Sequence, residues 1–187
     1  IEGSYRVFNN IERIVGEAPY ALWRPADGSA AKKVIVCCSN DYLGLSHHPE
    51  IIEAASNAIN KWGVGSGGTR NISGTANIHV QLENSLAKFH EKESALIFTS
   101  GFVANEASLA ALGEGLPNCV ILSDEKNHAS IIHGIRFARC EKRIFKHSDL
   151  QDLEKHLSSI PLETPKIIVF VSVYSMDGDI APIKEKR

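Results

Sequence analysis

The sequence predicts an α/β fold with a mostly parallel β-sheet and helices on both faces of the sheet. Two observations support this prediction. Short apolar runs such as "CVIL" and "IIVFV" alternate along the chain with longer segments in which apolar residues recur at helical spacing. Within these runs the apolar residues do not alternate with polar ones, which is typical of strands buried on both faces. With 43% hydrophobic and 22% charged residues, the 187-residue chain can form an ordinary globular core.

The first third of the chain contains a polar N-terminal segment, one strand and one helix. We expect a helix in residues 1–20, then a turn, and a strand at 34–38, where "VIVCC" is rich in β-branched residues. In 48–63 the apolar residues recur at helical spacing, and Gly63 ends the helix. The chain is therefore divided into an N-terminal helical segment, 1–33, and a main domain, 34–187.

The main domain continues as alternating helices and strands. Helices are expected at residues 77–90, 105–115, 129–138 and 148–160, and strands at 95–99, 119–124, 142–146 and 166–175. Ser148 is expected to cap the helix that follows it, because its hydroxyl can accept a hydrogen bond from an unpaired N–H group of the first turn.

Composition argues against several classes of protein. The net charge is −2 with both signs interspersed, so no basic face indicates a nucleic-acid partner. No apolar run approaches the ~18 residues that a membrane-spanning helix needs, and the first residues have no apolar signal-peptide core. The four cysteines fit neither a zinc site nor a disulfide framework, so we expect reduced, buried thiols in an intracellular protein.

The stretch "WGVGSGGTRNISGT" contains G-x-G-x-x-G at Gly63, Gly65 and Gly68. A dinucleotide-binding loop follows a strand and opens a helix, so that its N–H groups meet the pyrophosphate. Here the glycines follow a predicted helix, and the acidic residue about twenty positions on, Glu83, lies inside the next one. The remaining interpretations are a flexible turn, or a loop whose backbone approaches a ligand closely.

Polar residues follow four of the predicted strands, where open α/β sheets bind ligands. Asn40 can hold a small polar substrate or cap its turn. Gly101 and Phe102 can offer N–H groups to a phosphate at a helix start. His128 can be a general base, a metal ligand or a ring stacked on a flat cofactor, and a metal is discounted because no second His or Cys has ligand spacing. Together with Ser175, these residues predict one shared site.

The motifs "SNDYLG", "GSGGTRNISGT", "FTSGFVAN", "SDEKNHASIIHGIR", "IFKHSDL" and "VYSMDGD" together resemble those of the α-oxoamine synthases. These are pyridoxal-phosphate enzymes of the aspartate aminotransferase fold (fold type I), which join an amino acid to an acyl-CoA and release carbon dioxide. The resemblance implies that 34–187 is the N-terminal part of the large cofactor-binding domain, with the C-terminal part absent from this chain. It also implies that 1–33 contributes to substrate binding.

Within this family, "YRVFNNIER", "ALWRPADGS" and "TRNISGT" resemble the member that condenses glycine with succinyl-CoA. The products implied are 5-aminolevulinate, CoA and carbon dioxide, at the first step of haem and tetrapyrrole synthesis. The resemblance further implies a homodimer with its active site at the subunit interface. It places the protein in the bacterial cytoplasm, or in the mitochondrial matrix if it is eukaryotic.

The resemblance also implies roles for individual residues. For the cofactor, Gly101 and Phe102 bind the phosphate through backbone N–H groups, His128 stacks on the pyridine ring, and Ser175 bonds to the phenolic oxygen. For the substrates, Asn40 faces glycine, and Arg6, a planar donor of two parallel hydrogen bonds, pairs with the succinyl carboxylate. Three further residues shape the acyl pocket: Thr69, Asn71 and Ile72. CoA is contacted by Ser123 and Lys142.

Two departures from the family pattern leave alternatives open. No lysine of the chain matches the family's Schiff-base lysine motif, and Val171 stands where the family usually has an acidic residue. The alternatives are a glycine C-acetyltransferase, an 8-amino-7-oxononanoate synthase, or a non-catalytic fragment or regulatory subunit of the same fold. A dinucleotide-binding domain is a more distant possibility.

Overall fold

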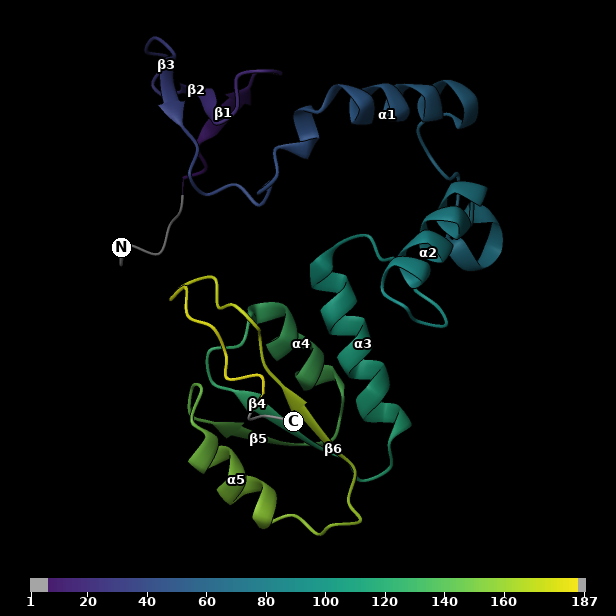
Figure 1. Ribbon diagram of the computed structural model, residues 1–187, viewed down its shortest axis with the longest axis vertical. Helices are drawn as coiled ribbons and strands as arrows, with labels where there is room; N and C mark the ends of the chain where they lie inside the picture. Colours follow the sequence, from purple (N-terminus) through teal and green to yellow (C-terminus); the bar gives the residue numbers. More distant parts are fainter. Residues whose placement is uncertain (1–6, 185–187) are drawn as a thin grey trace. The chain divides into compact units, whose positions relative to one another are not determined.

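The computed structural model describes residues 7–184 of the chain (Figure 1). The chain divides into two compact units, Ile1–Thr75 and Ala76–Arg187. The predicted α/β class is confirmed, because the second unit contains a parallel sheet with helices on both of its faces.

The first unit begins with a three-stranded antiparallel sheet, which the sequence analysis missed. Its strands are β1 (Asn10–Arg13), β2 (Tyr20–Arg24) and β3 (Lys32–Ile35), in the order β1-β2-β3. The helix expected in 1–20 is therefore wrong over its described part. Gly16, at φ +84°, and Pro19, which has no N–H group, interrupt helical hydrogen bonding, and the flanking residues pair as strands instead. The strand expected at 34–38 is present only at its start, because β3 ends at Ile35.

Helix α1 (Pro49–Trp62) confirms the helix expected at 48–63. Proline occupies its first turn, where its missing N–H group costs nothing. At the other end Gly63 has φ +79°, and its N–H group donates to the carbonyl oxygen of Ile59 at 2.8 Å. A short 3-10 helix, Leu45–His47, precedes α1.

The glycine-rich stretch follows α1, so it lacks the strand that a dinucleotide-binding loop requires. It leads into a single turn of π-helix, Arg70–Gly74, in which the Thr69 carbonyl oxygen accepts from the Gly74 N–H group at 2.8 Å. A Cβ atom at Gly74 would collide with the carbonyl group of Gly68. Glycine is needed here because the backbone passes close to itself.

The second unit contains four helices and a parallel sheet. Its elements are α2 (Asn77–Phe89), α3 (Gly101–Gly115), β4 (Val120–Asp124), α4 (Ala129–Phe137), β5 (Glu141–Phe145), α5 (Leu150–Ser158) and β6 (Lys166–Val169). The strands lie in the order β5-β4-β6, so β4 is central and is parallel to both neighbours. Val120 pairs with Glu141 on one side and with Lys166 on the other.

Alternate residues of β4 point into two separate cores, one on each face of the sheet. Ile121 packs with Leu109 of α3 and Ile131 of α4, whereas Leu122 packs with Leu153 of α5. Figure 1 shows α3 and α4 on one side of the sheet and α5 on the other. Every residue of β4 is buried, as the apolar run "CVIL" predicts.

Three details of the second unit differ from the sequence prediction. Residues 95–99 form no strand in the described chain, and the Ile97 N–H group donates to the Glu83 carboxylate at 3.0 Å instead of to a neighbouring strand. Asp149, not Ser148, caps α5, because Ser148 has φ +53° and an N-cap residue needs extended backbone. The last strand, β6, ends at Val169 rather than at 175.

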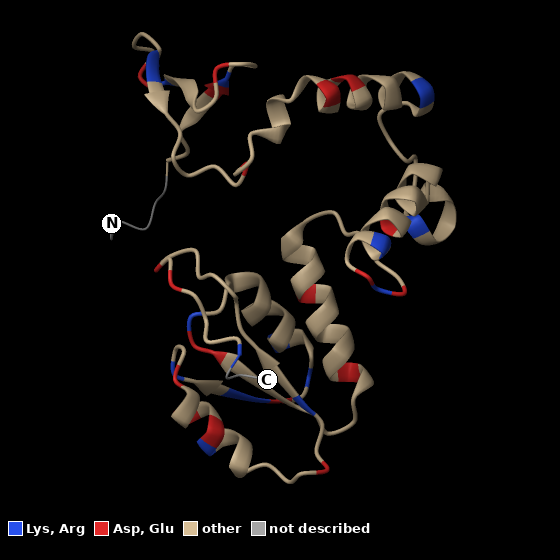
Figure 2. Ribbon diagram, in the orientation of Figure 1, with Lys and Arg blue, Asp and Glu red and all other residues tan. Residues whose placement is uncertain are grey.

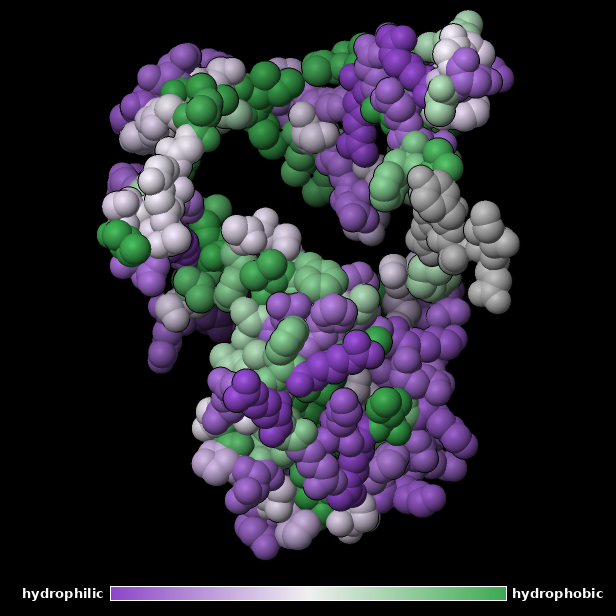
Figure 3. Space-filling model, turned by 180° about the vertical axis from the view of Figure 1, so that it is seen from behind, coloured by the Kyte–Doolittle hydropathy of each residue, from purple (hydrophilic) through white to green (hydrophobic). Residues whose placement is uncertain are grey.

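Lys and Arg residues are interspersed with Asp and Glu residues along both units (Figure 2). Large apolar side chains are exposed in both units, and hydrophobic residues are visible on the face of the molecule shown in Figure 3. Among the described residues, no helix is both long enough and apolar enough to cross a membrane.

Candidate functional site

The candidate site is a cavity of about 650 Å³ in the second unit. It lies beyond the carboxyl end of β4 and is lined by residues of α3, of the loop before α4, and of segment 171–177. His128 and Ser175, both expected from the sequence to share one site, line this same cavity. Val171, which departs from the family pattern, lines it as well.

The His128 ring is held by hydrogen bonds at the start of α4. Its Nδ1 atom accepts from the Ser130 N–H group at 3.2 Å and lies 2.7 Å from the Ser130 hydroxyl. That hydroxyl accepts in turn from the Asn105 side-chain amide at 2.9 Å. Because Nδ1 accepts hydrogen bonds, a neutral His128 carries its proton on Nε2. The ring is thereby fixed in one orientation, as a platform for a flat ligand must be.

Helix α3 begins beside this ring. Ser100 caps the helix and accepts from the Val103 N–H group at 3.2 Å. The N–H groups of Gly101 and Phe102 precede the first helical hydrogen bond and are free for an anion. A Cβ atom at Gly101 would meet nothing within 4 Å, so a ligand has room there. The Phe102 and His128 rings meet edge to face with centroids 6.3 Å apart, which brings the helix start next to the histidine.

Segment 173–180 folds into a tight turn that carries Ser175. Val173 and Ile180 form an isolated antiparallel bridge, and the Tyr174 N–H group donates to the Asp179 carbonyl oxygen at 3.0 Å. Gly178, at φ +74°, reverses the chain, and its N–H group donates to the Tyr174 carbonyl oxygen at 2.8 Å. Ser175 in this turn lines the cavity.

These features fit a phosphorylated, planar, aromatic cofactor. The unpaired N–H groups at the start of α3 suit a phosphate, the fixed His128 ring suits stacking, and Ser175 offers a hydroxyl donor. The fit depends on donors and space that the second unit provides by itself.

Four predicted residues of the second unit are not among those that line the cavity: Gly101 and Phe102 at the start of α3, and Ser123 and Lys142. Ser123 is buried within β4, where its hydroxyl oxygen accepts from the Asn127 side-chain amide at 2.9 Å. Lys142 is exposed on β5 and pairs in register with Ile121.

The predicted substrate residues of the first unit belong to two loops. Asn40 is exposed, and the turn around it is capped by Ser39, whose hydroxyl oxygen accepts from the Asp41 N–H group at 3.1 Å. In the other loop, the Thr69 hydroxyl donates to Oδ1 of Asn71 at 2.8 Å, and Ile72 is 84% exposed. Arg6 lies outside the described residues.

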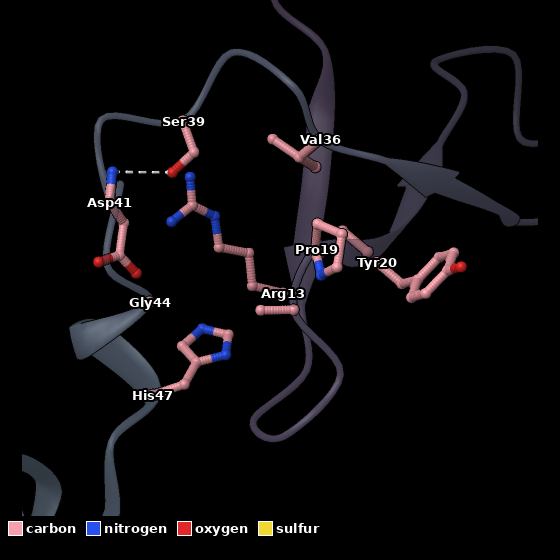
Figure 4. A pocket seen from close by; sticks show the side chains of 10 residues that line it. Arg13, Pro19, Tyr20, Val36, Ser39, Asp41, Gly44 and His47 are labelled. Carbon is pink, nitrogen blue, oxygen red and sulfur yellow. Dashed lines mark hydrogen bonds between the residues drawn. The ribbon is translucent and has the colours of Figure 1, made fainter.

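A smaller cavity of about 110 Å³ lies in the first unit next to Asn40 (Figure 4). The side chains of Arg13, Ser39, Asp41 and His47 surround it. Hydrogen bonds from the Ser46 hydroxyl and N–H group lower the pKa of Asp41, so this carboxylate stays charged beside Arg13.

The turn of Ser175 also takes part in a cluster of polar residues for which the sequence indicated no role. The His147 ring lies between the carboxylates of Asp124 and Asp179, at 2.9 and 2.7 Å. The hydrogen bond that the His147 ring donates to the Asp124 carboxylate raises the pKa of His147. Burial raises the pKa of Tyr174, the neighbour of both, to about 12. The only sequence signal for this group was the motif "IFKHSDL", which contains His147.

Comparison with known proteins relates the chain to pyridoxal-phosphate enzymes. Residues 32–187 match the model of the family described as aminotransferase class I and II. The chain is 55% identical to a mitochondrial 5-aminolevulinate synthase of Emericella nidulans over 97% of its own length and 27% of that protein. It is 54% identical to 5-aminolevulinate synthase 2 of Cereibacter sphaeroides, over 99% of this chain and 45% of that one.

Solved structures agree with these relatives. A serine palmitoyltransferase of Sphingomonas wittichii superposes with a TM-score of 0.82 at 33% identity, over 91% of this chain and 41% of that one. A high-resolution structure of SPT with PLP superposes with the same TM-score at 32% identity, over 94% and 42% of the two chains. The chain thus spans less than half the length of the proteins it matches here.

Proposed function

Because the chain belongs to the aminotransferase class I and II family, we propose that it is part of a 5-aminolevulinate synthase. This enzyme condenses glycine with succinyl-CoA and yields 5-aminolevulinate, CoA and carbon dioxide. The observation that carries the proposal is the identity of about 55% to such synthases over nearly the whole chain. The motif "TRNISGT", by which the sequence resembles this member, supports the same substrate pair.

The cavity of the second unit is assigned to pyridoxal phosphate. When bound, this cofactor serves as an electron sink that makes the α-proton of glycine removable. The N–H groups of Gly101 and Phe102 bind its phosphate, where the start of α3 favours negative charge. His128 stacks on its ring, and Ser175 donates to its phenolic oxygen.

The loops of the first unit are assigned to the substrates. Asn40 faces glycine, Arg6 pairs with the succinyl carboxylate, and Thr69, Asn71 and Ile72 shape the acyl pocket. Ser123 and Lys142 are assigned to CoA. The site lies at the interface of a homodimer, so the partner subunit completes it.

The test uses the full-length protein that contains this chain. CoA release is measured with glycine and either succinyl-CoA or acetyl-CoA, and pyridoxal-phosphate binding is measured by absorbance. We expect CoA release to be faster with succinyl-CoA, and His128→Ala to weaken cofactor binding and abolish release. Faster release with acetyl-CoA would instead assign the protein to glycine C-acetyltransferases.

Val171 favours a second candidate, a non-catalytic subunit of the same fold. It lines the cavity at a position where the family usually has an acidic residue. Cofactor binding without CoA release from any acyl-CoA would support this candidate, and recovery of release in Val171→Glu would identify the missing carboxylate as the cause.

A further inference from the structure

His147 connects two parts of the second unit that are far apart in the sequence. Its Nδ1 atom lies 2.9 Å from Oδ1 of Asp124, at the end of β4. Its Nε2 atom lies 2.7 Å from Oδ2 of Asp179, in the turn that carries Ser175. The His147 side chain is only 14% exposed, so water screens these contacts weakly.

The Asp124 end of this connection is rigid. The Asp124 side chain is fully buried, and its two oxygens accept from the N–H groups of Lys126 and Ser148, each at 3.0 Å. Burial alone would raise the pKa of Asp124, but these N–H groups, His147 and Tyr174 together hold it below its usual value. A charged carboxylate is therefore fixed on the central strand.

The Asp179 end belongs to the turn that carries Ser175, which a hydrogen bond between the Tyr174 side chain and the Asp124 carboxylate also ties to the end of β4. The Asp179 carbonyl oxygen accepts from the N–H group of Tyr174, the residue directly before Ser175. The Tyr174 ring meets the His147 ring edge to face, with centroids 4.4 Å apart. A third tie, between Lys126 and Asp177 at 3.1 Å, is nearly half exposed on both sides and contributes little.

Only a protonated imidazole can donate to both carboxylates at once, because the neutral ring carries a single N–H group. The acidic surroundings favour this form. The titratable and charged groups that face His147 are Asp124, Glu125 and Lys126 after β4, and Tyr174, Asp177 and Asp179 in the turn. With a neutral ring, one of the two carboxylates would lose its donor, and the charge that balances both would be absent.

We propose that His147 is a positioning residue that, as an imidazolium, holds the turn 174–179 against β4 and so places Ser175 on the cavity wall. The part of this inference that concerns Ser175 and the cofactor rests on the proposed function. The part that concerns the turn does not.

The first measurement is hydrogen exchange of the peptide that spans the turn, in the full-length protein without cofactor. His147→Gln should lower the protection of this peptide about tenfold at pH 6, since a charge-assisted hydrogen bond is lost. The matched control is His156→Gln, which removes another histidine near an aspartate, at 3.8 Å on α5. Asp179→Asn serves as a second variant of the same contact, because it removes the charge but keeps the shape of the side chain.

The second measurement is a double-mutant cycle on the dissociation constant of pyridoxal phosphate. His147→Gln should weaken binding about tenfold in the wild-type background and leave it unchanged in the Ser175→Ala background, because His147 acts through Ser175. The ratio of wild-type to His147→Gln affinity should fall toward one as the pH rises through the His147 pKa. A merely structural role would give neither result.

Three outcomes would count against the proposal. Unchanged protection of the turn in both folded variants would overturn it, as would equal weakening of cofactor binding with and without Ser175, or a ratio that does not vary with pH. A wild-type protein that binds no pyridoxal phosphate would overturn the proposed function alone, because the exchange measurement would still decide whether His147 holds the turn.

Discussion

The side-chain amide of Asn127 donates a hydrogen bond to the carbonyl oxygen of Val169 at 2.8 Å. It donates a second one to the Ser123 hydroxyl at 2.9 Å. Asn127 is 5% exposed, so water does not replace these bonds. One buried side chain thus connects the loop after β4 to the ends of both β4 and β6, next to the cavity.

Replacing Asn127 by alanine should lower the free energy of unfolding by about 1–3 kcal/mol, because it leaves buried polar groups unpaired. Urea denaturation measures this as a lower midpoint with an unchanged slope. Gln151→Ala, on the exposed face of α5, is the control and should change the midpoint little. Equal midpoints for the two variants would show that the amide contributes nothing.

At Gly134 the backbone of α4 passes close to α3. A Cβ atom at this position would lie 2.9 Å from the Cβ atom of Leu109 and 3.0 Å from the Asn105 carbonyl oxygen. We expect Gly134→Ala to cost about 1–3 kcal/mol of stability by overpacking. Gly115→Ala, at the end of α3, meets nothing within 4 Å and should be neutral or slightly stabilising. Thermal unfolding of both variants compares the two sites, and similar melting temperatures would contradict the prediction.

The Asp124–His147 pair predicts a defined pH range of maximum stability. The pKa of Asp124 is lowered from 3.8 in the folded state, so its contribution is lost as the pH falls through that lowered value. The pKa of His147 is raised from 6.5, so its contribution is complete below 6.5 and is lost as the pH rises through the raised value. Urea unfolding of wild type and His147→Gln should therefore differ most at mildly acidic pH and converge above the His147 pKa. A difference that persists unchanged at alkaline pH would contradict this assignment.

Cys119 should resist alkylation in the native protein. Burial and, to a smaller extent, the contact with Cys140 raise its pKa to about 11, so little thiolate forms near neutral pH. The expected burial of the thiols is wrong for Cys37 and Cys38, which are exposed because β3 ends at Ile35, before them. Treatment with iodoacetamide at pH 8, followed by peptide mass spectrometry, should label the adjacent pair well before Cys119. Early labelling of Cys119 would mean that the start of β4 opens readily.

The sequence pattern predicted correctly those helices and strands that are determined by residues close to one another in the sequence. Helices α1 and α4 follow from helical spacing and their terminal residues, and β4 follows from a short run that is apolar on both faces. Residues 95–99 have an equally apolar sequence but form no strand within the described chain. A strand exists only with a hydrogen-bonded neighbour, and the sequence of one segment does not say whether it has one. The strands β1 and β2 were missed for the converse reason: neither sequence, NIER or YALWR, is a clear apolar run, and pairing between the strands stabilises them.

The residues of the candidate site differ in the same way: some could be predicted from nearby sequence, and others depend on long-range contacts. His128 and Ser175 follow predicted strands, so the rule for open α/β sheets brings them to one cavity. The role of His147 depends on Asp124, 23 residues before it, and on Asp179, 32 residues after it. No spacing rule connects three residues so far apart. Only the topology, which brings the ends of β4, β5 and the turn together, reveals the contact.

The central position of β4 also fixes an order of assembly. β5 follows β4 closely in the sequence, so a nascent chain can pair these two strands and α4 early, through local contacts. The other edge of β4 must wait for β6, whose Lys166 pairs with Val120 only after α5 has been made. Until then an apolar strand edge stays open on the ribosome, where it is available to a chaperone or to a second nascent chain.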